Sequence, residues 1–117
     1  MQTPTMAIDK DGTIRYKLNG LRHRTDGPAY TGADGTEEWY LNGLLHRTDG
    51  PAVMYLNGTQ YWYLNGLRHR TDGPAYTGAD GTQLWHLNGT KYSFDDFCKE
   101  LRLTDEKIVF LKLKYNH

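Results

Sequence analysis

The sequence predicts a mainly β fold of stacked antiparallel β-hairpins, closed at its C-terminus by an α-helical cap. Three observations lead to this prediction: a 23-residue repeat, a dense series of Asn-Gly and Asp-Gly dipeptides, and a tail in which both patterns stop. A fixed period of this length is typical of stacked supersecondary units. With 117 residues, of which 38% are hydrophobic and 13% aromatic, the chain suits one thin, sheet-rich domain.

One copy of the repeat reads Asp-Gly-Thr-x-x-Trp-x-Leu-Asn-Gly-Leu-x-His-Arg-Thr-Asp-Gly-Pro-Ala, followed by four more residues. Three full copies and a truncated fourth follow one another without a gap. The chain is therefore expected to contain an N-terminal strand or cap (1–10), a repeat array (11–92, with full copies at 11–33, 34–56 and 57–79) and a helical cap (93–117).

The glycines indicate where the chain reverses direction. All but two of the 13 glycines, Gly32 and Gly78, directly follow Asn or Asp. These dipeptides are favoured in tight hairpin turns because both residues tolerate positive φ. The segments between them are too short for helices and are rich in aromatic and branched residues. Short antiparallel strands are the prediction for the whole array.

Alternation along these strands sorts the side chains onto two faces of the sheet. The first face keeps its aromatic and leucine character in every copy, so we assign it to the core. It comprises Tyr16, Leu18, Trp39, Leu41, Trp62, Leu64, Trp85 and Leu87.

The second face changes from charged to apolar along the array. We expect the C-terminal tail to cover its apolar end, because a solenoid needs a cap on its last apolar face. In order along the chain its residue pairs are Arg15/Lys17, Glu38/Tyr40, Tyr61/Tyr63 and Leu84/His86.

The tail carries helix signals. Ser93 followed by two acidic residues is typical of a helix start, and the apolar residues behind it recur at helical spacing. Thr104, followed by Asp105 and Glu106, predicts a second helix. Residues 107–115 also alternate as a strand would, and helix is the preferred interpretation. The apolar face of the first helix comprises Phe94, Phe97, Cys98 and Leu101.

Positions at which the copies disagree are the candidates for partner contact. The middle copy has Val53-Met54-Tyr55-Leu56-Asn57 where its neighbours have Tyr-Thr-Gly-Ala-Asp. The neighbours themselves are identical over residues 18–36 and 64–82, which indicates a recently copied double unit. The predicted protein-binding residues lie on the variable second face: Glu38, Tyr40, Tyr61, Tyr63, Leu84 and His86.

The repeated His-Arg pairs allow two interpretations. Stacked at one repeat position, they would form a cationic ladder able to hold a nucleotide or another small anion. Alternatively, they bond the Asp three residues after each His (Asp26, Asp49 and Asp72) or that turn's backbone, and serve folding alone. The candidate anion-binding residues are Arg22, His23, Arg24, His46, Arg47, Arg68, His69 and Arg70.

Other chemistry has little support in the sequence. The 14 basic and 14 acidic residues cancel, so no bulk field favours nucleic acid. Histidines one repeat apart are too widely spaced to share a metal ion. The single cysteine, Cys98, lies on an apolar helix face and is expected in the core. We therefore expect no cofactor and no enzymatic activity. Without a leader-like start or a long apolar segment, we expect a cytoplasmic protein with no membrane contact.

Residues 19–29, which read Asn-Gly-Leu-Arg-His-Arg-Thr-Asp-Gly-Pro-Ala, recur at 42–52 and 65–75. With the 23-residue period, they resemble the MORN repeat (membrane occupation and recognition nexus) over residues 11–89. The form NGxxHRxDGPA is most similar to divergent arrays in large phages and other large DNA viruses. The usual Tyr-x-Gly opening is replaced here by Trp-x-Leu, so lipid binding is not carried over.

The resemblance implies stacked hairpins and a non-enzymatic role in binding or scaffolding. For a viral accessory protein, it implies that a host protein, such as a defence component, is bound and inhibited or redirected in the host cytoplasm. Two alternatives stay open from the residues themselves: an anion or nucleotide sponge that uses the His-Arg ladder, and a scaffold or homodimer that assembles through sheet edges or the cap.

Overall fold

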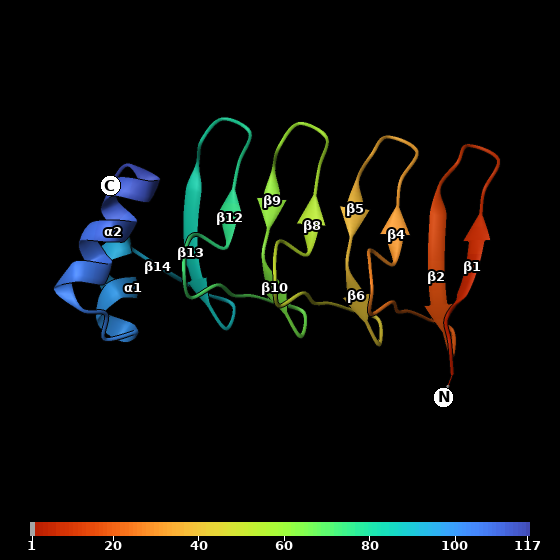
Figure 1. Ribbon diagram of the computed structural model, residues 1–117, viewed down its shortest axis with the longest axis horizontal. Helices are drawn as coiled ribbons and strands as arrows, with labels where there is room; N and C mark the ends of the chain where they lie inside the picture. Colours follow the sequence, from red (N-terminus) through yellow and green to blue (C-terminus); the bar gives the residue numbers. More distant parts are fainter. Residues whose placement is uncertain (1) are drawn as a thin grey trace.

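The computed structural model describes residues 2–117 as a row of antiparallel hairpins followed by two helices. Figure 1 shows the hairpins side by side along the long axis, from the N-terminal strands to the helices at the opposite end. The molecule is elongated, with extents of 49 × 32 × 20 Å. The predicted mainly β architecture with C-terminal helices is confirmed.

One continuous antiparallel sheet runs the length of the array, in the order β1-β2-β4-β5-β8-β9-β12-β13-β14. Each unit therefore adds a hairpin beside the one before it, as the 23-residue period predicts. The strands are β1 (Thr5–Ile8), β2 (Ile14–Leu18), β4 (Tyr30–Thr31), β5 (Glu37–Glu38), β8 (Val53–Met54), β9 (Gln60–Tyr61), β12 (Tyr76–Thr77), β13 (Gln83–Leu87) and β14 (Thr90–Tyr92).

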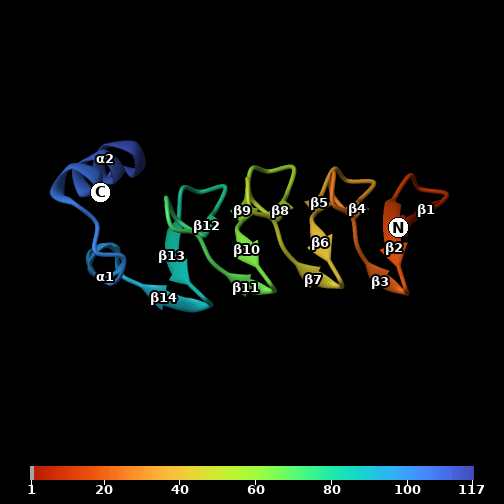
Figure 2. The same ribbon diagram turned by 60° about the horizontal axis from the view of Figure 1, so that its bottom comes forward.

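A second, smaller hairpin leaves the sheet in each unit and lies along its lower side in Figures 1 and 2. Its two-residue turn is Asn-Gly, and both residues have positive φ, for example 50° at Asn42 and 80° at Gly43. These values match the turn type whose twist suits a two-residue hairpin. The strands are β3 (Leu21–Arg22), which pairs with β2, then β6 (Tyr40–Leu41) with β7 (Leu44–Leu45), and β10 (Tyr63–Leu64) with β11 (Leu67–Arg68).

The Asp-Gly dipeptides fall into two classes that the sequence does not distinguish. Those at the tips of the large hairpins, such as Asp34-Gly35, have a glycine with positive φ (90° at Gly35). In those before the prolines, such as Asp49-Gly50, the glycine does not have a positive φ. These dipeptides lie in a loop between units rather than in a hairpin turn. The expectation that these dipeptides mark hairpin turns therefore does not hold for the Asp-Gly before each proline.

The cap consists of α1 (Phe94–Glu100) and α2 (Asp105–Tyr115), so the segment 107–115 is helical. The Ser93 hydroxyl accepts a hydrogen bond from the Asp96 N–H, and Thr104 does the same for Lys107. Both helices thus begin at the predicted capping residues. Asn116, with φ of 59°, ends α2 in the left-handed conformation common at helix C-termini.

The main core lies where the cap meets the last hairpin. Trp85 on β13 packs against the Phe94 and Phe97 rings, with centroids 5.0 and 4.8 Å away. The cap therefore covers the C-terminal end of the first face, not of the second face as predicted. The buried residues of this core are Trp85, Leu87, Phe94, Phe97, Cys98 and Leu111.

Burial along the rest of the first face is lower than predicted. Trp39 and Trp62 are half-buried, unlike Trp85. The sheet is a single layer, and the helices lie only over its last rung, so no second layer is packed on the earlier tryptophans. Within residues 2–117, no helix is long and apolar enough to cross a bilayer.

We predict that Phe97→Ala destabilises the protein by about 3–5 kcal/mol, because it removes a fully buried aromatic ring from the core under the cap. Leu113→Ala, at a position that is 77% exposed on the same cap, is the matched control and should change stability by less than about 0.5 kcal/mol. Urea unfolding measures both. Equal losses in the two variants would contradict the assignment of the core.

Candidate functional site

Neighbouring units are joined by the same pair of hydrogen bonds at each junction. The His23 Nδ1 atom accepts a bond of 3.0 Å from the Asn42 N–H, nineteen residues ahead in the next unit. Beside it, the Gly43 N–H donates to the Arg22 carbonyl over 2.8 Å. The bonds recur as His46 to Asn65 and His69 to Asn88, and as Gly66 to Leu45 and Gly89 to Arg68. Each histidine thus contacts the next unit's turn rather than its own aspartate.

The arginine after each histidine braces its own loop. The Arg47 Nε atom donates to Asp49 over 2.8 Å, and one terminal nitrogen donates to the Pro51 carbonyl over 3.2 Å. The guanidinium carbon lies 3.9 Å from the centroid of the Trp39 ring, within the range of a cation–π contact. A Cβ atom at Gly50 would lie 2.8 Å from that guanidinium, which explains the glycine without any demand on φ. Arg24 and Arg70 repeat this arrangement over Tyr16 and Trp62.

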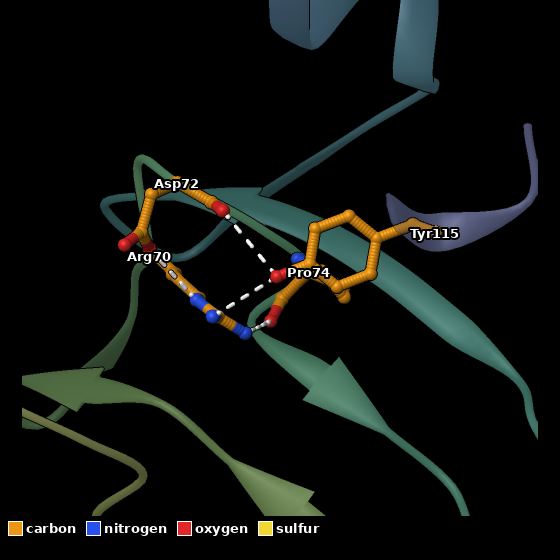
Figure 3. A network of polar contacts seen from close by, with 4 residues as sticks. All are labelled: Arg70, Asp72, Pro74 and Tyr115. Atoms are coloured by element: carbon orange, nitrogen blue, oxygen red, sulfur yellow. Dashed lines mark hydrogen bonds and ion pairs between the residues drawn. The ribbon is translucent and has the colours of Figure 1, made fainter. Parts of the chain in front are cut away.

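The cap is fastened to the last of these loops. Figure 3 shows the Tyr115 hydroxyl between Arg70 and Asp72. It accepts a bond of 3.1 Å from Arg70 and donates to the Asp72 carbonyl over 3.4 Å. Arg70 therefore has one more partner than its counterparts in the earlier units, and this extra bond ties α2 to the array.

The structure divides the predicted cationic ladder between the two faces. Arg22 and Arg68 lie on the second face, where Arg22 contacts Glu38 and the Tyr40 hydroxyl at 3.4 and 3.3 Å. Arg68 donates to the Tyr63 hydroxyl over 3.4 Å. The histidines and the other three arginines belong to the unit junctions and the first face. One continuous ladder of all eight candidate residues does not form.

Two repeated clefts open on the first face beside the tryptophans, with volumes of about 180 and 320 Å³. Each holds two arginines, and each arginine uses one N–H to bond an aspartate and one to bond a proline carbonyl, so part of its set of five N–H donors is already engaged. Anion binding stays a prediction. The smaller cleft is lined by Arg47, Thr48, Trp62, Leu64, His69, Arg70, Thr71 and Asp72, and the larger by Arg24, Thr25, Trp39, Leu41, His46, Arg47, Thr48 and Asp49.

The second face is hollowed at the middle unit. In the first unit, the Arg22 guanidinium covers the Tyr30 ring, 4.9 Å from its centroid. The middle unit has Leu45 and Val53 at these two positions, so neither the arginine nor the ring is present. The result is an open hollow of about 230 Å³, here called the tyrosine hollow. Its lining residues are Glu38, Leu45, Val53, Tyr55, Tyr61, Tyr63 and Arg68.

Aromatic contacts hold the walls of the tyrosine hollow. The Tyr61 ring lies 4.8 Å from Tyr76, 6.1 Å from Tyr55 and 6.3 Å from Tyr63, measured between centroids. Arg68 lies 5.0 Å from the Tyr61 centroid. Tyr55 is nevertheless 42% exposed. The rings are thus fixed by one another while part of their surface faces solvent. Burial raises the pKa of the Tyr55 hydroxyl.

Three of the six predicted contact residues, Glu38, Tyr61 and Tyr63, line the tyrosine hollow. Tyr40 lies beside it, where its hydroxyl donates to Glu38 over 3.0 Å and burial raises its pKa. The remaining two predicted contact residues, Leu84 and His86, are absent from its lining.

Leu84 is half-buried on β13, opposite Tyr76 on β12. His86 is only 6% exposed, and burial together with nearby Arg68 lowers its pKa. The interior position of His86 leaves little of its side chain for a partner to contact.

Sequence reasoning missed Leu45, and it singled out Val53 and Tyr55 as part of the divergent middle copy without including them among the predicted contact residues. The signal was present, because the middle copy departs from its neighbours at these positions. The second-face list came from the alternation of only one strand per unit, and these residues lie on the adjacent strands and hairpin loop. Arg68 was predicted as an anion-binding residue of the His-Arg ladder, whereas in the structure it lines the tyrosine hollow.

The residues that the structure describes offer few side chains suited to nucleophilic catalysis or metal binding. Cys98 is buried in the core, and burial raises the pKa of its thiol, which disfavours the reactive thiolate. Among residues 2–117, no group of three or more His, Cys, Asp or Glu side chains could hold a metal ion.

Searches of protein-family models, of curated proteins and of solved structures found no match to the chain. The site is therefore interpreted from its own geometry, with the MORN-like repeat as a resemblance in sequence.

We predict that His46→Ala costs about 0.5–1.5 kcal/mol, because the Asn65 N–H loses its hydrogen-bond acceptor. The same change at His23 or His69 should cost a similar amount, and the triple variant about the sum, since the junctions share no residue. Thr48→Ala, at an exposed position of the same loop, is the control. Denaturant unfolding checks these values, and three histidine variants as stable as wild type would contradict the role of the junction.

We predict that stability falls on acidification below the ordinary pKa of Asp. Asp11, Asp34 and Asp80 each accept a hydrogen bond from the backbone N–H of the Thr two residues later, which lowers the pKa of each carboxyl. The unfolded chain therefore binds more protons in this range, and the stabilisation is lost as pH falls through the folded values.

The tip of the β8–β9 hairpin supplies a matched control for this pH effect. Asn57 already accepts the equivalent bond from Thr59 over 3.0 Å. Asp11→Asn, Asp34→Asn and Asp80→Asn together should keep the turns and weaken the loss of melting temperature in acid. Part of the loss should remain, because a hydrogen bond from Arg47 also lowers the pKa of Asp49. An unchanged acid profile in the triple variant would contradict the prediction.

Proposed function

We propose that this chain is a non-enzymatic protein-binding module whose contact site is the tyrosine hollow on the second face. The observation that carries the proposal is the position of the hollow. It opens at the one full unit where Leu45 and Val53 replace the arginine and tyrosine of both neighbours. The junction bonds of this unit are the same as elsewhere, so the fold itself does not require the departure.

The chemistry of the hollow suits a side chain inserted from another protein. Tyrosine rings offer a large, stiff contact area with a polar end, and arginine and tyrosine are enriched among residues that dominate interface energies. Leu45 and Val53 provide an apolar lining. Glu38 and Arg68, which also line the hollow, place opposite charges beside it. A partner is expected to insert an apolar or aromatic residue that has polar or charged neighbours of its own.

The resemblance to repeat arrays of large phages supports a host protein as the partner. On that basis the chain binds a host protein, such as a defence component, and thereby inhibits or redirects it. This part of the proposal rests on the resemblance and not on the geometry of the hollow.

The sponge alternative is favoured by the two repeated clefts on the first face, where arginine and tryptophan stack. A sponge would be stabilised by its ligand, so its melting temperature would rise with added ATP or inorganic phosphate. The protein-binding proposal predicts no rise with either. A rise that Arg47→Ala abolishes would favour the sponge over the protein-binding module.

The test of the proposed function is to give the middle unit the sequence of its neighbours. The fold is expected to survive, because every new residue already stands at the same position in the neighbouring units. The new arginine and tyrosine are expected to fill the tyrosine hollow. The changes are Leu45→Arg, Val53→Tyr, Met54→Thr, Tyr55→Gly, Leu56→Ala and Asn57→Asp.

Affinity purification from host cells, quantified by mass spectrometry, compares this variant with wild type and with Phe110→Ala, which removes a half-exposed ring from the cap. We expect a protein that wild type and Phe110→Ala retain and the filled variant loses. Equal retention by all three, with the filled variant folded by its amide spectrum, would overturn the proposed site.

A further inference from the structure

The two ends of the array are finished differently. The C-terminal end of the sheet is covered by the helical cap, whereas among residues 2–117 β1 pairs with β2 alone and is the outermost strand at the N-terminal end (Figure 1). All four residues of β1 are exposed. An outermost strand of this kind presents unpaired backbone groups to any strand that approaches it.

The hydrogen bonds of β2 show which β1 groups point outward. Met6 lies opposite Tyr16, and the Tyr16 N–H and carbonyl are bonded on the far side, to Ala29 and His23. In an antiparallel pair, residues opposite each other face either both inward or both away. Met6 therefore points its N–H and carbonyl away from the sheet, and so does Ile8, two residues along. Asp9 comes one residue after Ile8 and therefore points the other way: its N–H donates to the Thr13 carbonyl over 2.9 Å.

This pattern is self-complementary in a single register. If two β1 strands run antiparallel about Ala7, Met6 of each copy lies opposite Ile8 of the other, and each such pair exchanges two hydrogen bonds. Moving the centre to Met6 would place Ile8 opposite Pro4, which has no N–H to donate. Moving it to Ile8 would bring in Lys10, which lies in the turn after β1. Only the Ala7-centred register uses every outward group.

The side chains fit the same register. Met6 and Ile8 are 48% and 59% exposed, and both lie on the face of Tyr16. In the pairing about Ala7 they would cover one another across the two-fold axis, in the way that apolar cross-strand pairs stabilise sheets. Ala7 is small enough for the close approach at the centre. Residues 5–8 contain no charge and no proline, the usual devices that protect an edge strand.

We infer that a second copy of this chain is the partner of the β1 edge, and that two arrays join head to head through an antiparallel β1–β1 pair centred on Ala7. The sheet continues from one copy into the other, and the two caps lie at the far ends. The contact is small, so the dimer dissociates on dilution. It involves neither the tyrosine hollow nor the first-face clefts, and it is independent of the proposed function.

The test combines mass and hydrogen exchange over a concentration series from micromolar to millimolar. Light scattering should show a shift from one chain to two as concentration rises. Over the same range, the Met6 and Ile8 amides should pass from rapid to slow exchange, while the Ala7 amide, which points to β2, stays protected throughout. A monomer at every concentration overturns the inference. So does a dimer in which the Met6 and Ile8 amides exchange rapidly.

Ile8→Pro removes an outward donor and places a ring against the incoming strand, while the inward bonds of β1 remain, so it should be monomeric and folded. Ile8→Val is the matched control and should dimerise. Met6→Lys with Ile8→Lys, which sets like charges opposite each other, is the second disrupting variant in case proline unfolds β1.

The other exposed apolar patch, Val109, Phe110 and Leu113 on α2, is tested by Phe110→Lys. Loss of the dimer in Phe110→Lys but not in Ile8→Pro or the double lysine variant would overturn the proposed interface.

Discussion

The hydrogen bond between each histidine Nδ1 atom and the backbone N–H of the next unit's Asn is the interaction on which the array depends. The structure is one layer thick, so a unit has stabilising contacts only with its neighbours and with the cap. At this bond the Asn-Gly turn of one unit is held against the loop of the unit before it. The adjacent glycine bond to a carbonyl fixes the same junction a second time. Together with the strand pairs β4–β5, β8–β9 and β12–β13, which continue the sheet from one unit to the next, this repeated pair of bonds holds neighbouring hairpins side by side.

Most constant positions of the repeat are explained once this junction is in place. The arginine keeps its loop closed by bonding Asp and the Pro carbonyl, and it covers the aromatic ring that a second layer would otherwise cover. The glycine before each proline leaves space for that guanidinium. The side chains of the second face take no part in the junction bonds, and they can vary from copy to copy at little cost to folding. The tyrosine hollow is the largest consequence of that freedom.

The sequence was sufficient for the parts of the fold that local chemistry determines. Asn-Gly spacing predicted the hairpins, and Ser93 and Thr104 predicted both helix starts. It was not sufficient where the answer depends on which elements meet in space. The partner of each histidine is a backbone group nineteen residues away, and the burial of Trp85 but not Trp39 depends on where the helices fold back. The binding site was predicted in part, since Tyr61 and Tyr63 follow from strand alternation. Leu45 and Tyr55 required knowledge of which strands lie side by side.

The most direct test of this account is to remove one complete unit, residues 34–56, so that Ala33 is joined to Asn57. His23 would then face Asn65 through the same bond, and Asn57 would replace Asp34 in the hairpin tip. The account predicts a shortened protein that unfolds in one cooperative transition at lower denaturant concentration, with the amide spectrum of the cap unchanged. Loss of the β signal, or a cap that no longer folds, would contradict the claim that identical junctions between neighbours hold the array together.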